Sequence, residues 1–168
     1  GTYNLSDVIV DGSNNNIGVD QYGVKNYSRV SATGNSNTVN VYQSNSGGNV
    51  SGHYSGATVL GSANTINVSQ TGDGSKISFI SVDGSLNNIS NLQNGAGNKY
   101  SDIKAIGNGH TVILDQKDGG AHAARVEVTN IGGASNVNVL QQGTTNQSYL
   151  LQQQCATSSG CSVTITQQ

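Results

Sequence analysis

The sequence predicts an all-β fold, a β-solenoid of about seven two-stranded rungs, from features that recur together. Glutamine returns at intervals of 22 to 27 residues, an apolar residue stands four positions before each of these glutamines, and a glycine stands nine positions before six of them. Two stretches in each interval alternate polar and apolar residues, which is typical of strands with one buried face. Such a unit cannot bury its apolar face alone, so we expect consecutive units to stack in parallel and in register. The recurring residues are Gln21, Gln43, Gln70, Gln93, Gln116, Gln141 and Gln167.

Each unit is expected to run strand, turn, strand, turn. The clearest copy has a first strand over residues 78–83, a turn over 84–88 and a second strand over 89–93. A glycine after the first strand supplies the positive φ that a tight reversal needs, and Gly, Asn and Asp after each glutamine serve the second turn. The whole chain, 1–168, is predicted to form one solenoid with rungs at approximately 4–26, 27–49, 50–75, 76–98, 99–122, 123–146 and 147–168. The turn glycines are Gly12, Gly34, Gly61, Gly84, Gly107 and Gly132.

The same alternation predicts a core made of two facing rows of side chains. Hydrophobic residues make up 33% of the chain and aromatic residues 5%, with no Trp or Met, so this core must be narrow. The first row contains Val8, Val10, Val30, Ala32, Ala57, Val59, Ile80, Val82, Ile103, Ala105, Val126 and Val128. The second contains Ile17, Val19, Val39, Val41, Ile66, Val68, Val112, Leu114, Val137 and Val139.

Composition argues against several classes of protein. Charged residues make up 10% of the chain and the net charge is −2, without the charge imbalance of a disordered chain. No basic stripe is present to neutralise phosphates, so no nucleic acid partner is expected. No apolar run reaches the roughly 18 residues needed to cross a bilayer, so membrane insertion is not expected. Because the sequence starts at Gly1 without a signal segment, we expect a processed, mature form.

Stacking in register makes equivalent residues of successive rungs neighbours, which predicts ion pairs outside and amide ladders inside. The inward glutamines, and the loop asparagines six positions before four of them, need partners if they are buried. Stacked carboxamides provide them, because each donates to the rung on one side and accepts from the other. The expected ion pairs are Asp7–Arg29, Asp102–Arg125 and Lys104–Glu127, and the loop asparagines are Asn15, Asn37, Asn64 and Asn87.

The segment 37–43, Asn-Thr-Val-Asn-Val-Tyr-Gln, is followed by a Gly/Asn loop and another alternating strand, and it resembles the repeat of curlin, the subunit of bacterial curli amyloid fibres. Ser148 and Gln154 keep that repeat's Ser-to-Gln spacing, and Gln93 with Gly95 keeps its turn. The chain departs from the curlin pattern in having more rungs, first strands that mostly end in Gly, and a cysteine pair. The resemblance implies a structural subunit of a secreted, extracellular functional amyloid fibre that forms biofilm matrix and supports adhesion. It further implies export through an outer-membrane channel and nucleation by a minor subunit.

Two cysteines lie in the last unit, at the ends of a turn four residues longer than the corresponding turn of the first unit. These are Cys155 and Cys161. In an extracellular protein, a pair closing so short a loop is expected to form a disulfide. Without a nearby histidine the pair does not make a tetrahedral metal site, and no metal or cofactor is predicted.

No residue pattern indicates an enzyme. His53, His110 and His122 all fall in predicted turns and are interpreted as solvated loop residues. No two rungs place the carboxylate cluster expected of a polysaccharide-cleaving β-helix. The alternative to a fibre subunit is a soluble β-solenoid adhesin or other cell-surface binding module, with the longer loop between Gln43 and Ser55 as its contact.

The terminal rungs favour a fibre over a monomer. Solenoids that stay monomeric need capped ends, whereas here rung one is as apolar as the interior rungs and the chain has no Pro to blunt an edge. We therefore expect copies of the chain to join head to tail, an open contact that propagates. At this subunit interface the predicted neighbours are Leu150 on Val8, Val163 on Ile17, Ile165 on Val19 and Gln167 on Gln21, with Leu151 covering Ile9 on the outer face.

Overall fold

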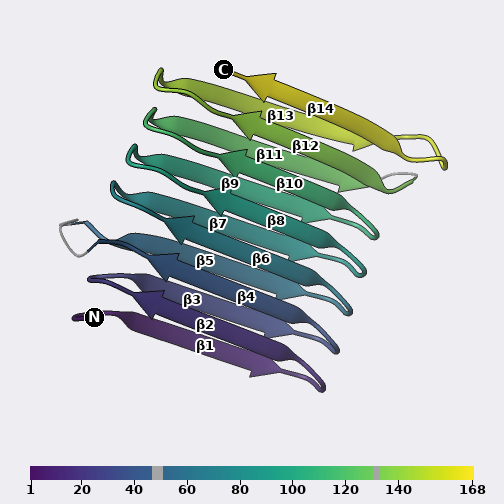
Figure 1. The fold of residues 1–168 in the computed structure, drawn as a ribbon. Helices are drawn as coiled ribbons and strands as arrows, with labels where there is room; N and C mark the ends of the chain where they lie inside the picture. The colour runs from purple at the N-terminus through teal and green to yellow at the C-terminus, as the bar shows by residue number, and fades with distance from the viewer. Residues whose placement is uncertain (47–50, 131–132) are drawn as a thin grey trace.

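The computed structural model describes residues 1–46, 51–130 and 133–168, which form strands joined by turns. Odd-numbered strands make one parallel sheet and even-numbered strands another, so each rung contributes one strand to each sheet (Figure 1). The first sheet runs β1 (Leu5–Asp11), β3 (Tyr27–Thr33), β5 (His53–Leu60), β7 (Lys76–Asp83), β9 (Lys99–Ile106), β11 (His122–Asn130) and β13 (Gln147–Cys155). The second runs β2 (Asn16–Tyr22), β4 (Thr38–Ser44), β6 (Thr65–Thr71), β8 (Asn88–Gln93), β10 (Thr111–Gln116), β12 (Ser135–Gln141) and β14 (Cys161–Gln167).

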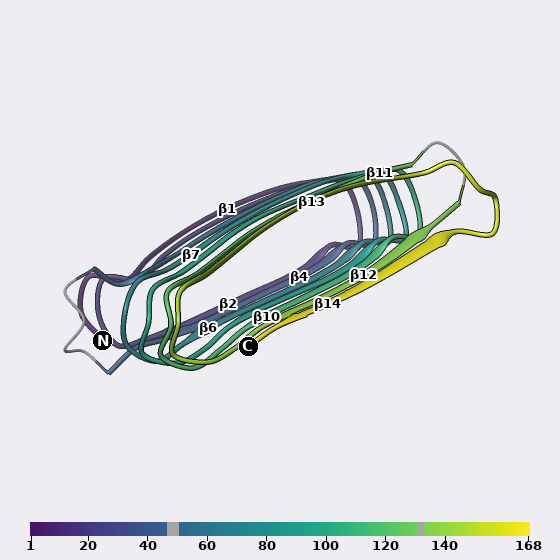
Figure 2. The same ribbon diagram turned by 90° about the horizontal axis from the view of Figure 1, so that it is seen from above.

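Viewed along the stack, each rung is a flattened loop whose two strands face each other (Figure 2). Neighbouring strands of a sheet pair residue for residue, as Val8, Val30 and Ala57 do in β1, β3 and β5. The two termini lie at opposite ends of the stack (Figure 1). The molecule is an all-β solenoid of about seven turns with about 23 residues per turn, which confirms the predicted fold class.

The core is a narrow layer between the two sheets, and both predicted rows of side chains lie in it. In the interior rungs these side chains are buried. In the first rung they lack neighbours on one side, so Val8 is 44% exposed and Val10 45% exposed, while Ile17 and Val19 are partly buried. Burial in this fold therefore depends on stacking as much as on the facing sheet.

One polar residue stands within the second row of the core. Asn91 occupies the position that is aliphatic in the other rungs, and it is fully buried. Its Nδ2 donates to Ser78 Oγ at 2.7 Å and to Ser101 Oγ at 2.6 Å. The inward serines at the start of the facing strands thus satisfy the Nδ2 group, whereas Asn91 Oδ1 is buried without a hydrogen-bond partner among the described residues.

The first turn of the first five rungs contains a glycine at the same position, and the geometry there requires it for two reasons. Gly34 and Gly61 have φ of 119° and 124°, in the left-handed region that side chains disfavour. A Cβ on Gly61 would also lie 1.9 Å from the carbonyl oxygen of Gly84 in the next rung. The predicted turn residue Gly132 lies outside the described residues, as does the segment 47–50 within the longer loop proposed as an adhesin contact.

The last rung differs from the sequence prediction in the face that β13 presents to the core. Leu150 lies opposite Arg125 on the outer surface and is 63% exposed, while Leu151 lies opposite Val126 and packs against the core. The predicted inward position of Leu150 and outward position of Leu151 are therefore wrong.

The pairing of Leu150 with Val8 requires Ser148 to point inward, whereas Tyr149 occupies that position, opposite Ala124. In the three preceding rungs the inward residue follows the ladder glutamine by eight positions, as Ser101 follows Gln93, and eight positions after Gln141 is Tyr149. Because side chains alternate between faces, a slip of one residue reverses the whole strand. The turn before β13 thus decides which leucine is inside.

Candidate assembly surfaces and interior polar rows

Glutamine side chains form a continuous ladder along the second sheet. Nε2 of each glutamine donates to Oε1 of the next, at 2.7 to 2.9 Å in every step from Gln21 to Gln167. The same amide reaches across the core to a backbone carbonyl of the facing strand, as Gln43 does to Tyr27 O at 3.0 Å. Each carboxamide therefore joins its rung both to the next rung and to the other sheet. The interior amides are completely buried, so these bonds replace the ones they would make with water.

A second ladder lies in the first turn. The backbone N–H and Nδ2 of Asn37 donate to Asn15 Oδ1 at 2.9 and 3.1 Å, and Asn64 and Asn87 repeat the pattern. The ladder ends at His110, whose N–H donates to Asn87 Oδ1 at 2.8 Å.

His110 is completely buried at this end of the asparagine ladder. Its Nε2 donates to Ile106 O at 2.8 Å, and its Nδ1 accepts from Ser135 N–H at 3.0 Å. The imidazole thus takes over the linking role of an asparagine, and its interpretation as a solvated loop residue is wrong.

A third interior row, which the sequence analysis missed, lies at the start of four strands of the first sheet. His53, Lys76, Lys99 and His122 are the first residues of β5, β7, β9 and β11, lie opposite one another, and are each at most 2% exposed. The interpretation of His53 and His122 as solvated is also wrong. Carbonyls of the second turn point inward beside this row and need donors, which these side chains supply.

Both lysines are surrounded by backbone carbonyls of the second turns. Lys76 Nζ donates to Asp73 O, to Gly95 O at 2.8 Å and to Gly97 O at 3.1 Å. Lys99 Nζ makes the equivalent bonds one rung further on, to Gly120 O and to Asp118 O at 3.0 Å. The ammonium groups hold turns of adjacent rungs together from inside.

Each histidine of the third row uses Nε2 in the same way. His53 Nε2 lies 3.2 Å from Ser44 O, and His122 Nε2 lies 2.8 Å from Lys117 O. A sequence signal for the row does exist, because each of these residues stands two positions before an inward Ser or Ala and so continues the alternation by one step.

Burial dominates the electrostatics of the third row. Burial, reinforced by the positive charge of Lys99 and partly opposed by Asp73, lowers the pKa of Lys76 to about 8. Burial also lowers the pKa of Lys99, where Asp118 opposes it. The pKa values of His53 and His122 are lowered by burial and by their neighbours Lys76 and Lys99 respectively.

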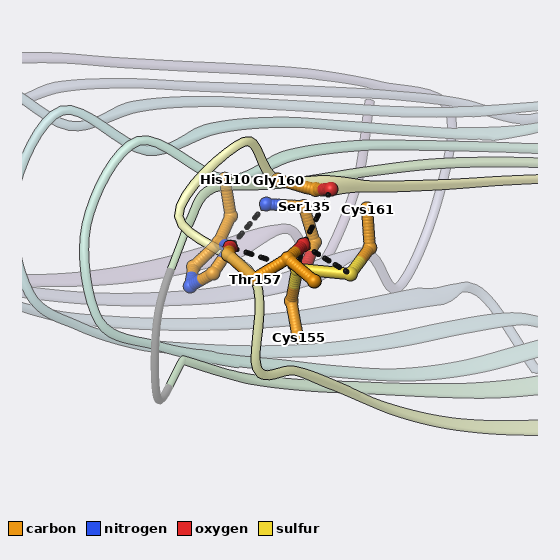
Figure 3. The surroundings of a disulfide bond; sticks show 6 residues. All are labelled: His110, Ser135, Cys155, Thr157, Gly160 and Cys161. Carbon is orange, nitrogen blue, oxygen red and sulfur yellow. Dashed lines mark hydrogen bonds between the residues drawn. A yellow bond between two sulfur atoms is a disulfide. The ribbon is translucent and has the colours of Figure 1, made fainter.

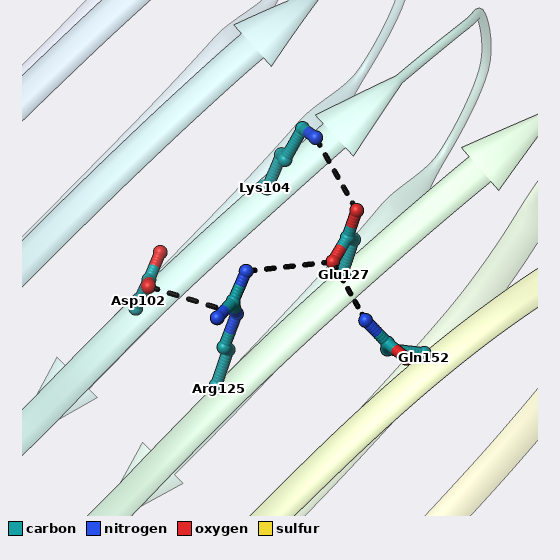
Figure 4. A network of polar contacts seen from close by, with 5 residues as sticks. All are labelled: Asp102, Lys104, Arg125, Glu127 and Gln152. Atoms are coloured by element: carbon teal, nitrogen blue, oxygen red, sulfur yellow. Dashed lines mark hydrogen bonds and ion pairs between the residues drawn. The ribbon is translucent and has the colours of Figure 1, made fainter.

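The outer face of the first sheet carries the three predicted ion pairs. Arg29 and Asp7 are 3.6 Å apart, which confirms the expected contact between the first two rungs. The other two pairs join into one network, in which Lys104 and Glu127 are 3.2 Å apart and Arg125 and Asp102 3.7 Å (Figure 4). Such exposed pairs are each worth only about 0 to 1 kcal/mol, so they favour the register more than they stabilise the fold.

Glu127 extends this network into the last rung. It lies 3.6 Å from Arg125 and accepts a hydrogen bond from Gln152 Nε2 at 3.1 Å, so charged and amide groups link three successive strands (Figure 4). The hydrogen bonds from Gln152 and Lys104 lower the pKa of the Glu127 carboxyl.

The last rung is closed by a covalent bond between its strands. Cys155 ends β13, Cys161 begins β14, and a disulfide joins them with their Cα atoms 5.6 Å apart (Figure 3). Ser135 pairs with Cys161, so the disulfide occupies the place in the last rung that the asparagine ladder holds in the first four. Within the loop, Thr157 Oγ1 donates to Gly160 O at 3.1 Å.

The two ends of the solenoid are open strand edges. At one end β1 and β2 have a neighbour on one side only, and Val8, Ile9 and Val10 are exposed there. At the other end β13 and β14 are the edges, with Leu151, Val163 and Ile165 partly buried. An edge strand offers unpaired N–H and C=O groups to any strand that can align with it.

Residues 1–46, 51–130 and 133–168 contain no group of three or more His, Cys, Asp or Glu side chains suited to a metal ion. Over the same residues, no helix has the length and apolar character needed to cross a membrane.

Comparison with known proteins assigns part of this repeat to a family. A family model described as the curlin associated repeat matches residues 12–44, a segment that contains β2, β3 and β4 with ladder residues Gln21 and Gln43. No curated protein and no solved structure matches the chain significantly. The curlin repeat is a structural unit and not a catalytic one, and curlins form extracellular fibres. The match over residues 12–44 and the β-solenoid of about seven turns are consistent with a curlin-family subunit.

Proposed function

We propose that this protein is a structural subunit of a secreted, curli-like amyloid fibre that polymerises head to tail by rung stacking and contributes to biofilm matrix and surface adhesion. The observation that carries the proposal is the pair of open ends. Both present parallel strand edges and inward apolar side chains that lack a neighbour on one side. Stacking one end on the other continues both sheets and leaves new open ends, so the contact propagates.

The register within the molecule extends to a junction between molecules. Continuing the pairing of β11 with β13 by one more rung puts Leu151 on Val8, Leu150 beside Asp7, and Gln152 beside Ile9. In the second sheet, Val163 meets Ile17, Ile165 meets Val19 and Gln167 meets Gln21. Each aliphatic side chain buried in this way contributes roughly 1.5 to 3 kcal/mol.

The direction of the hydrogen bonds in the glutamine ladder also supports a head-to-tail contact between molecules. Within the molecule, every Nε2 donates towards the rung nearer the C-terminus, so Gln167 presents Nε2 outward and Gln21 presents Oε1 outward. A donor at one end and an acceptor at the other suit a head-to-tail contact and not a head-to-head one. By the family resemblance, a nucleating subunit and an outer-membrane export channel are proposed as partners.

Elongation of preformed fibre seeds tests the proposal and its register together. Leu151→Lys places a charge in the apolar contact with Val8, so we expect the rate of seeded elongation to fall by at least tenfold. Leu150→Lys is the matched control, because the new ammonium lies on the outer face, between Arg125 of its own chain and Asp7 of the next molecule, and should leave elongation near the parental rate. Hydrogen exchange of rungs two to five should be the same in both variants.

Two outcomes would contradict the proposal. Parental elongation by Leu151→Lys would mean that the junction lies elsewhere. A parent chain that stays monomeric in size-exclusion chromatography and forms no fibres by electron microscopy would favour the soluble adhesin instead.

A further inference from the structure

The third interior row brings four basic side chains together without a carboxylate among them. His53, Lys76, Lys99 and His122 follow one another on adjacent strands, which lie about 4.8 Å apart in a sheet. Beyond the row, Asn26 stands next to His53 and Gln147 next to His122, and neither is charged. From the second sheet, the neutral amides of the glutamine ladder donate to the backbone carbonyls of the residues that directly follow the row, as Gln70 does to Tyr54 O at 2.8 Å and Gln93 to Ile77 O at 3.0 Å.

The carboxylates nearest to this row lie outside it. Asp73 and Asp118 are in the exposed second turns, where Asp73 accepts a hydrogen bond from Ser46 and Asp118 accepts one from Gly143 N–H at 3.0 Å. Lys117 also belongs to the second turn, and its ammonium lies 4.0 Å from Asp115. These groups offset part of the charge on the lysines but do not enter the row.

Each of the two histidine rings makes one hydrogen bond to a turn carbonyl, and near His53 the backbone of Gly52 and Gly72 offsets part of the effect of burial on the pKa. Nε2 donates to a turn carbonyl, and Nδ1 of both His53 and His122 is buried without a partner among the described residues. A second proton, on Nδ1, would be a buried donor without an acceptor. It would also place a positive charge next to Lys76 in one case and next to Lys99 in the other.

We propose that the third row makes the solenoid acid-sensitive. Rungs three to six are stably folded only while His53 and His122 are neutral, so acidification opposes folding. It thereby also opposes the addition of subunits to a fibre. The consequence for fibre growth rests on the proposed function, whereas the consequence for folding does not. The direction follows from linkage. A histidine that is harder to protonate in the folded chain favours the unfolded chain as pH falls below about 6.5, the value expected when unfolded.

The stability of the soluble full-length chain tests the proposal without any need for fibre growth. Urea unfolding between pH 8 and pH 5.5 should show a loss of stability for the parent, about tenfold in the folding equilibrium for each unit of pKa difference that is fully titrated. His53→Asn with His122→Gln should remove most of that loss. These replacements are the residues that the neighbouring rungs carry in the same row, at Asn26 and Gln147.

A second pair of variants distinguishes the effect of the buried charges in the row from the effect of charges on the surface. Lys76→Gln with Lys99→Gln keeps both histidines but removes the adjacent charges, so the loss on acidification should shrink. Arg29→Gln with Arg125→Gln removes two exposed cations and should leave the loss unchanged. An equal loss in the parent and in the double histidine variant would overturn the proposal.

The protonation state can also be read directly, should a variant fail to fold. Nitrogen NMR of the folded parent at pH 6 should show the His53 and His122 rings neutral and protonated at Nε2. Charged rings at pH 6 in a chain that has lost no stability would overturn the proposal. Seeds that fail to elongate at every pH would instead contradict the proposed fibre function, since the unfolding measurement decides the acid dependence by itself.

Discussion

Lys76 lies directly opposite Lys99 on the neighbouring strand, and both ammonium groups donate to the carbonyl oxygen of Gly97, at 3.1 and 3.4 Å. Two buried like charges at adjacent positions are tolerated because the second turns surround them with carbonyl dipoles. The turn backbone, and not a side-chain counter-ion, is the partner of these cations. The arrangement makes the second turns depend on the side chains that fill them.

The buried lysines of the third interior row predict a gain of folding stability at alkaline pH. The folded-state pKa of Lys76 is about 8 and the unfolded value is about 10.4, so between these values the unfolded chain holds the proton more tightly. The free energy of unfolding should therefore rise as pH increases from about 8 to 10.4 and stay level just below 8. Urea titrations over this range measure it. Lys76→Gln should lose much of the rise, and Lys104→Gln, on the outer surface, should keep it.

Ile80 tests the assignment of inward and outward residues in the first sheet. Ile80→Asp buries an unpaired charge between two rungs and should cost several kcal/mol in the free energy of unfolding, on the order of 3 to 5 kcal/mol. Ser81→Asp is the control, because Ser81 points outward and lies opposite Lys104. Chemical denaturation compares the two. Equal stability of both variants would mean that the faces of β7 are wrongly assigned.

Alanine substitutions at Gly61 and Gly56 compare a turn position with a strand position of the same rung. Gly61→Ala should be strongly destabilising, because φ is 124° and the new Cβ would lie 1.9 Å from Gly84 O. Gly56→Ala should be tolerated, since its Cβ would meet Phe79 at an ordinary 3.4 Å on the outer face. Thermal unfolding followed by circular dichroism gives the comparison. A turn that accepts alanine at Gly61 without loss would contradict the close stacking of these turns.

Reduction of the disulfide should loosen the last rung alone. Closure of so short a loop contributes about 2 to 3 kcal/mol by restricting the unfolded chain. Hydrogen exchange in the presence of reductant should therefore show less protection across residues 150–165, with rungs two to five unchanged. The Cys155→Ser, Cys161→Ser variant provides the matched control and should behave like the reduced parent without responding to reductant. Equal protection of residues 150–165 in both redox states would count against a stabilising role.

The repeat, the two-sheet solenoid and the members of the core rows could all be predicted from the amino-acid sequence. Period-two alternation and recurring Gly and Gln positions reveal which residues share a face, because strand geometry is the same in every rung. The three ion pairs followed from the same reasoning, since register alone brings Asp7 to Arg29 and Lys104 to Glu127.

The location of the polar residues at the turns, and the face of β13 that points into the core, depend on how the rungs stack in three dimensions. His53, His110 and His122 looked like loop residues, but the turns curve inward and their carbonyls need buried donors, a demand that no local pattern expresses. Leu150 and Leu151 are both apolar neighbours, so alternation alone does not choose between them. The length of the preceding turn and the pairing with β11 make that choice, because both are set by how one rung closes onto the next.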